Sequence, residues 1–222
     1  MYKTILRESI YEEEVKKSKF IAYLAPVQSK EEAEDYILSI KDKHKDARHN
    51  CSAYIIGEEG LIQKYDDDGE PQKTAGPPIL DVLKNKELKN VVCVVTRYFG
   101  GILLGAGGLI RAYSGACTEA VNKSKIVTME SFEKIRFTYD YTCHGSIENY
   151  LLNHGYPMEE QEFLDKVTIS TYVGQKNKDT FIETINDKTS GNLEVVSKEE
   201  IILPTYESKL LWKGNLYKQG NE

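Results

Sequence analysis

The spacing of apolar residues in the first half of the chain alternates between the two-residue period of strands and the 3.6-residue period of helices. Strands are predicted at residues 3–7, 19–27, 50–57 and 90–99. The last of these contains an uninterrupted apolar run, Val91–Val95, which indicates a strand buried on both faces. Residues 61–76 are polar, acidic and interrupted by glycines, so we expect a loop with little regular structure there.

Three helices are predicted in the same half. Ser29 with Glu32 three residues later forms a capping box, which begins the first helix. Pro77 and Pro78 suit the first turn of a short second helix. The third runs from about 108 to 124 and carries one apolar side. Together these elements predict an α/β domain over residues 1–125.

The second half predicts a separate domain over residues 133–204. Its elements follow the order strand, helix, strand, strand, helix, strand: 133–141, 146–153, 158–163, 166–173, 180–189 and 193–202. This is the ferredoxin-like βαββαβ pattern, so the fold class of the whole chain is two-domain α+β. Residues 205–222 form a polar tail apart from 210–212, and these three apolar residues leave open whether the tail docks or frays.

Composition places the chain among folded proteins. It has 222 residues, of which 40% are hydrophobic, and a formal net charge of −6. Residues 1–125 carry 19 basic and 19 acidic side chains, so the whole excess of acid lies after residue 125. An acidic chain argues against indiscriminate nucleic-acid binding, although a local basic patch remains possible. No apolar run has the roughly 20 residues that a membrane span needs, and we expect no membrane partner.

The cysteines and the first residues suggest the compartment. Four cysteines lie far apart with no C-x-x-C pair, which excludes a zinc ribbon and a dithiol redox site. The first 20 residues lack the apolar stretch of a signal peptide. We therefore expect a cytoplasmic protein with reduced thiols and no cofactor.

The densest chemical signal is a glycine-rich segment between the buried strand and the third helix. Glycine permits close backbone approach, and a helix N-terminus offers unpaired N–H groups with a partial positive charge. Such a turn is a ready anion site, and two arginines there could add full charges. The candidate anion- or RNA-binding residues are Arg97, Tyr98, Gly100, Gly101, Gly105, Gly107, Gly108 and Arg111. The alternative is a tight turn that needs glycine for packing alone.

Aromatic residues beside Arg97 add one further possibility. Tyr98 and Phe99 could stack on unpaired bases, or they could pack in the core. Alternation along the strand places the two rings on opposite faces.

The acidic stretch before the second helix offers two interpretations. Asp66, Asp68 and Glu70 are a weak candidate for a divalent cation site. The stretch lacks the full EF-hand spacing, and aspartate followed by glycine and proline is ordinary turn chemistry. We favour the turn and expect no metal.

His49 and Cys51 form the one candidate for catalysis. The two side chains would lie on the same side of a strand, and a Cys–His pair can form an activated nucleophile. Nothing in the sequence places an acid or amide to orient His49. The alternative is a buried, inert thiol beside a histidine at the strand edge.

Several of these segments together resemble the Impact family, in its bacterial YigZ-like branch. The matching segments are 18–21, 48–54, 67–71, 74–78, 96–101 and 104–113. They include four residues already named as candidates, His49, Cys51, Asp68 and Glu70. They also include motif positions that the residues alone did not mark: Asn50, Asp67, Gly69, Pro71, Thr74 and Gly76. The resemblance covers about residues 18–125, and the remainder is similar to the small C-terminal domain of that branch.

The resemblance implies a fold for each domain and a role in translation. The N-terminal domain would be an α/β sandwich similar to domain IV of elongation factor G, and the C-terminal domain would be ferredoxin-like. Eukaryotic relatives are translational regulators that use an additional N-terminal domain, which is not found in this sequence. We therefore expect an RNA- or ribosome-associated binding protein, with a protein partner in translation control as a further possibility. An enzyme acting on a phosphorylated or nucleotide ligand and a purely protein-binding module are the alternatives.

Overall fold

The computed structural model describes residues 1–220. Its contacts divide the chain into two compact units, one of residues 2–127 and one beginning at residue 128 together with Met1. Each unit has its own hydrophobic core. No helix within residues 1–220 has the length and apolar character needed to cross a membrane.

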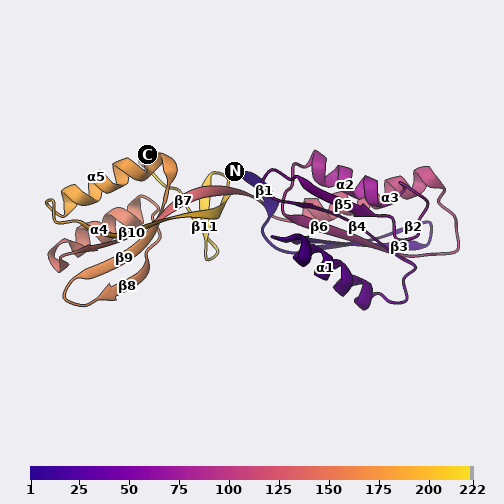
Figure 1. The fold of residues 1–222 in the computed structure, drawn as a ribbon, viewed down its shortest axis with the longest axis horizontal. Coiled ribbons are helices and arrows are strands. Elements are labelled where there is room, and N and C mark those ends of the chain that lie inside the picture. The colour runs from indigo at the N-terminus through magenta and orange to yellow at the C-terminus, as the bar shows by residue number, and fades with distance from the viewer. Residues whose placement is uncertain (221–222) are drawn as a thin grey trace. The chain divides into compact units, whose positions relative to one another are not determined.

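The first unit is a three-layer sandwich around one antiparallel sheet (Figure 1). The strands lie in the order β2-β3-β6-β4-β5. Their bounds are Ser9–Val15 for β2, Ser18–Pro26 for β3, His49–Ile56 for β4, Ile62–Asp66 for β5 and Val91–Tyr98 for β6. A short strand, β1 (Tyr2–Ile5), precedes them and forms a parallel bridge from Lys3 to Leu88.

Helices cover both faces of this sheet. α1 (Lys30–Lys43) lies on one face, whereas α2 (Gly76–Asn85) and α3 (Ala106–Lys123) lie on the other (Figure 1). The central strand β6 alternates between the two cores: Val91 and Val95 face α2 and α3, and Val92 and Val94 face α1. The prediction that this strand is buried on both faces is confirmed, because every residue from 91 to 97 is buried.

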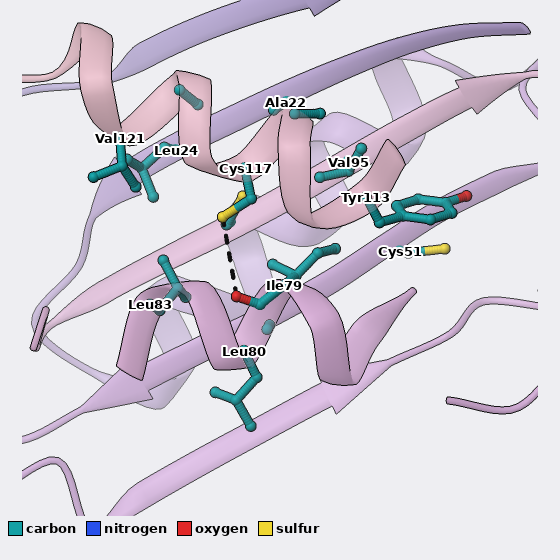
Figure 2. Packing of buried hydrophobic residues seen from close by; sticks show 14 of the residues in the cluster. Ala22, Leu24, Cys51, Ile79, Leu80, Leu83, Val95, Tyr113, Cys117 and Val121 are labelled. Atoms are coloured by element: carbon teal, nitrogen blue, oxygen red, sulfur yellow. Dashed lines mark hydrogen bonds between the residues drawn. The ribbon is translucent and has the colours of Figure 1, made fainter. Parts of the chain in front are cut away.

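The helix starts follow the sequence signals. The Ser29 hydroxyl accepts a hydrogen bond from the backbone N–H of Glu32 at 3.1 Å, which confirms the predicted cap of α1. Pro77 and Pro78 lie in the first turn of α2, also as predicted. In the core beneath α2 and α3, the Cys117 thiol faces the carbonyl oxygen of Ile79 across the two helices (Figure 2).

Two strands lie where none was expected. β2 forms the sheet edge beside β3, and the predicted loop over 61–76 contains β5, which pairs with β4 from Ile62↔Ile56 to Asp66↔Ser52. All five residues of β5 are exposed, so the strand has no buried face. Without a buried face it shows no two-residue alternation, which is the signal on which strand prediction depends.

The second unit is ferredoxin-like, as predicted. Its core elements are β7 (Ile126–Tyr139), α4 (His144–Asn153), β8 (Glu159–Phe163), β9 (Val167–Gly174), α5 (Lys178–Lys188) and β10 (Glu194–Tyr206). The central strands lie in the order β10-β7-β9-β8, and both helices pack on one face of the sheet through a shared core.

The tail docks on the same sheet. β11 (Lys209–Trp212) pairs with the end of β10, and β12 (Asn215–Tyr217) pairs with β11. Their side chains cover a second apolar cluster on the face opposite the helices, where the Tyr172 and Trp212 rings lie 4.5 Å apart. Residues 221 and 222 of the predicted tail lie outside the described residues.

The core beneath α2 gives a stability prediction. Ile79 is fully buried, so we expect Ile79→Ala to lower the free energy of unfolding by about 2–5 kcal/mol, because the removed atoms leave a cavity. Urea unfolding followed by circular dichroism measures the change. Ile10 is 48% exposed, and Ile10→Ala serves as the control with a much smaller effect. Equal losses in the two variants would contradict this description of the core.

Candidate functional site

The loop between β5 and α2 is built around the carboxylate of Asp67. Its Oδ1 accepts hydrogen bonds from the backbone N–H groups of Ala75 at 3.0 Å and Gly76 at 2.8 Å, and its Oδ2 accepts one from Lys73 at 2.8 Å. Asp67 therefore satisfies amides at the start of α2. Gly76 has no room for a side chain, because a Cβ there would lie 2.9 Å from the carbonyl oxygen of Asp66.

Lys41 of α1 occupies the neighbouring carboxylates. Its ammonium lies 2.7 Å from Oδ1 of Asp68 and 3.8 Å from Oδ2 of Asp66. The other oxygen of Asp68 accepts a hydrogen bond from the backbone N–H of Asn50 at 2.7 Å. The carboxylate of Glu70 does not join Asp66 and Asp68, because its partners are Arg97 and Tyr113. Within residues 1–220 no group of three or more His, Cys, Asp or Glu side chains is arranged to hold a metal ion, so this loop gives no support to a cation site.

A buried carboxylate joins three elements of the first unit. Oε1 of Glu70 lies 2.7 Å from Nη1 of Arg97 in β6, and it accepts a hydrogen bond from the Tyr113 hydroxyl in α3, also at 2.7 Å. The side chains of Glu70 and Arg97 are 3% and 6% exposed. Burying a charge pair is costly, and hydrogen bonds offset that cost. Here one oxygen of Glu70 serves two donors, whereas Nε of Arg97 is buried with no hydrogen-bond partner among the described residues.

The same arginine connects to the glycine-rich segment through Ser18. The Ser18 hydroxyl accepts hydrogen bonds from Nη2 of Arg97 at 3.4 Å and from the backbone N–H of Gly100 at 3.2 Å. Gly100 is required there, because a Cβ would overlap the carbonyl oxygen of Lys17. The turn between β2 and β3 therefore lies directly against the start of the glycine-rich segment.

The two arginines of the candidate anion site have different surroundings. Arg97 points inward to Glu70, and its guanidinium lies 5.5 Å from the ring centres of Phe20 and Phe99. Arg111 is exposed, and within the described residues it forms no ion pair. Gly107 lies in the first turn of α3, and Nη1 of Arg111 lies 3.7 Å from the position that a Cβ at Gly107 would occupy.

The remaining candidate residues divide between core and surface. The Tyr98 hydroxyl bonds to Nδ1 of His44 at 2.8 Å, and its ring packs on the core beneath α1. Phe99 lies beside Arg97 and is 40% exposed. The Tyr98 ring is therefore mainly internal, whereas the Phe99 ring is partly exposed to solvent. Gly101 and Gly105 have positive φ values of 84° and 70°, which suit glycine.

The N-terminus of α3 has no side-chain cap among residues 1–220. Its N-cap, Gly105, has no side chain, and no side chain of the described residues caps the helix. Gly107 and Gly108 lie in the first turn rather than before it, and an α-helix leaves its first four N–H groups without internal partners. These amides, the helix dipole and the exposed guanidinium of Arg111 together give a locally positive surface.

His49 and Cys51 do not form an activated pair. Nδ1 of His49 donates to the carbonyl oxygen of Asp68 at 2.8 Å, and its Nε2 lies 4.0 Å from Oε1 of Glu70. The thiol of Cys51 donates to the carbonyl oxygen of Asp67 at 3.0 Å. Burial raises the pKa of the Cys51 thiol, with nearby acidic groups adding to the rise, so the nucleophilic thiolate is disfavoured.

Three residues of the site carry no functional signal in the sequence: Ser18, Lys41 and Tyr113. The apolar side of the predicted third helix includes Tyr113, and this pattern predicts burial but not a carboxylate partner. Ser18 and Lys41 carry no local signal, because each contacts a group that is distant in the sequence.

Comparison with known proteins identifies the family. Residues 16–121 match the Impact N-terminal domain, and residues 137–192 match a domain of unknown function, DUF1949. The IMPACT family member YvyE of Bacillus subtilis is 42% identical over 198 residues, covering 89% of this chain and 91% of that protein. The chain belongs to the IMPACT family.

Further relatives agree with the bacterial branch. The IMPACT family member YigZ of Escherichia coli is 43% identical over 113 residues, covering 50% of this chain and 55% of that protein. A crystal structure of a hypothetical protein is 29% identical, with a TM-score of 0.56 over 89% of this chain and 97% of that one.

The buried charge pair gives a second stability prediction. We expect Glu70→Ala to lower the free energy of unfolding by about 3–5 kcal/mol, because it leaves the charge of Arg97 buried without its partner. Adding Arg97→Met should cost less than the sum of the two single losses. Urea unfolding of the single and double variants measures both.

An exposed ion pair provides the control for Glu70. Glu12 and Lys19 lie 2.6 Å apart, but their side chains are 53% and 45% exposed. Glu12→Ala should therefore leave stability nearly unchanged. Strict additivity in the Glu70 and Arg97 variants would contradict the coupling of the buried pair.

Thiol labelling tests the state of the cysteines. Cys51, Cys93 and Cys117 are buried, whereas Cys143 is partly exposed. In the native protein at pH 8 we expect an aromatic disulfide reagent to modify one thiol per chain rapidly, and Cys143→Ser to abolish that reaction. Labelling of Cys51 at a comparable rate, before unfolding, would show an accessible thiolate instead.

Proposed function

We propose that this protein binds RNA or the ribosome through the N-terminus of α3 and regulates translation without catalysing a reaction. The observation that carries the proposal is the exposed guanidinium of Arg111 beside the uncapped first turn of α3. Phosphate groups favour such a position, because backbone N–H groups, the helix dipole and a full charge act together. Lys16 and Lys17, both exposed, lie on the turn that packs against Gly100 and extend the positive surface.

In this proposal Arg97 positions the site rather than contacting phosphate. Its charge is paired with Glu70 inside the protein, and its second guanidinium nitrogen reaches Gly100 through Ser18. The loss of Arg97 would therefore act on the shape of the glycine-rich segment, whereas the loss of Arg111 would act on the charge presented to a ligand.

The charge of the whole chain supports selective binding. The formal net charge is −6, so long-range repulsion opposes contact with arbitrary polyanions and leaves a local site to provide attraction. The family resemblance implies a role in translation control, and that role would place the protein in the cytoplasm.

A protein partner is the second candidate. Ile102 and Leu103, in the glycine-rich segment, are 42% and 82% exposed. Exposed apolar side chains at the edge of a positive surface favour contact with a protein more than with RNA alone. On the ribosome, RNA and protein lie close together, so one surface can meet both.

The salt dependence of binding tests the proposal. We expect Arg111→Ala to weaken binding to a structured RNA hairpin or to bacterial ribosomes, and to reduce the slope of log K against log salt by about 0.7–0.9, which corresponds to one lost phosphate contact. Fluorescence anisotropy or co-sedimentation across a salt series measures the slope.

Arg7 provides a matched control. It is also exposed, and it follows β1 close to Ser9, whose hydroxyl bonds to the carbonyl oxygen of Ala120 near the opposite end of α3. Arg7→Ala removes the same charge and should leave the slope unchanged. If both variants bind like the wild-type protein, the N-terminus of α3 is not the binding site.

A further inference from the structure

A small pocket of about 230 Å³ lies between β2 and α3. Its walls include the side chains of Val15, Leu104 and Ala112, and its charged groups are Glu13, Lys16 and Arg111. Typical ligand pockets measure about 300–1,000 Å³, so this one has room for a fragment no larger than a single nucleobase.

The helix side of the pocket is open because it carries small residues. Gly108 and Gly115 line it together with Ala112, one helical turn apart. A Cβ at Gly115 would lie 3.7 Å from Oε1 of Glu13, so the carboxylate reaches across to the helix surface. A larger side chain at position 115 would occupy the space that a ligand needs.

Glu13 is the unusual group in this pocket. It is half-buried, and within residues 1–220 it forms no ion pair within 4.0 Å, although Lys16 and Arg111 line the same pocket. Burial and the nearby Glu119 raise the pKa of its carboxyl group. A partly desolvated carboxylate without a donor gains from any ligand that brings one.

We propose that the pocket binds an unpaired guanine, with Glu13 accepting hydrogen bonds from the base and Arg111 and Lys16 holding the adjacent phosphate. The inference rests on the proposed function and assigns it a base preference. Val15, Leu104 and Ala112 provide apolar contact for the faces of the ring.

The edge of guanine explains the preference. A carboxylate has two acceptor oxygens, and guanine offers two neighbouring donors, N1–H and N2–H, so both bonds form at once. Adenine and cytosine each place one amino donor beside a ring nitrogen acceptor, and uracil flanks its single donor with two carbonyl oxygens. In each of these bases an acceptor would face the negative charge of Glu13, so the base would bind less tightly.

The experiment uses the full chain and four labelled five-nucleotide RNAs that differ only in the central base, with uridines elsewhere. Fluorescence anisotropy at low salt measures the affinities. We expect the guanine RNA to bind about 10-fold more tightly than the others, which is in the range of one bidentate base contact. Glu13→Gln should abolish the preference without weakening binding to the other three RNAs, because it removes a negative charge and one acceptor.

Glu14→Gln is the matched control, since it removes the same charge from β2 at an exposed position outside the pocket lining. It should retain the guanine preference. If the wild-type protein binds all four RNAs equally, or if Glu13→Gln keeps the preference, the guanine pocket is wrong while the proposed RNA binding stands. If none of the four RNAs binds at any salt concentration, the guanine pocket is wrong; if the hairpin and the ribosomes do not bind either, the proposed function fails as well. An unchanged melting temperature of Glu13→Gln shows that a lost preference does not come from loss of folding.

Discussion

The buried pair of Glu70 and Arg97 is the interaction on which the architecture of the first unit depends. One carboxylate oxygen draws together the loop before α2, the end of β6 and the second turn of α3. Removing two charges from water is costly, and the two hydrogen bonds to Oε1 of Glu70 offset part of that cost. The same guanidinium contacts the Ser18 hydroxyl, which also accepts a hydrogen bond from Gly100 at the start of the glycine-rich segment.

Because of this internal pairing, Arg97 and Arg111 have different roles, although the sequence alone does not distinguish them. Arg97 is neutralised inside the protein, and its contribution is geometric. Arg111 remains outside, next to amides that no described side chain caps. The positive surface is thus small and depends on backbone as much as on side chains, which suits a protein whose total charge is negative.

Much of the fold could be predicted from periodicity and end signals. The run Val91–Val95, the Ser29 cap and the βαββαβ order each depend on residues close in the sequence, and each is confirmed. β5 could not be predicted, because neither of its faces is buried. The direction of Arg97 could not be predicted either, because its partner Glu70 is 27 residues away and no local pattern records the pairing.

The hairpin of β11 and β12 covers the face of the second unit's sheet that lies opposite α4 and α5. Trp212, Leu210 and Tyr217 lie over Phe132, Tyr172 and Leu203, all on the face that the two helices leave bare. In a ferredoxin-like domain that face of the sheet is often a binding surface. Here the chain itself covers the face, so a ligand could reach it only by displacing a hairpin that is paired with β10 through backbone hydrogen bonds.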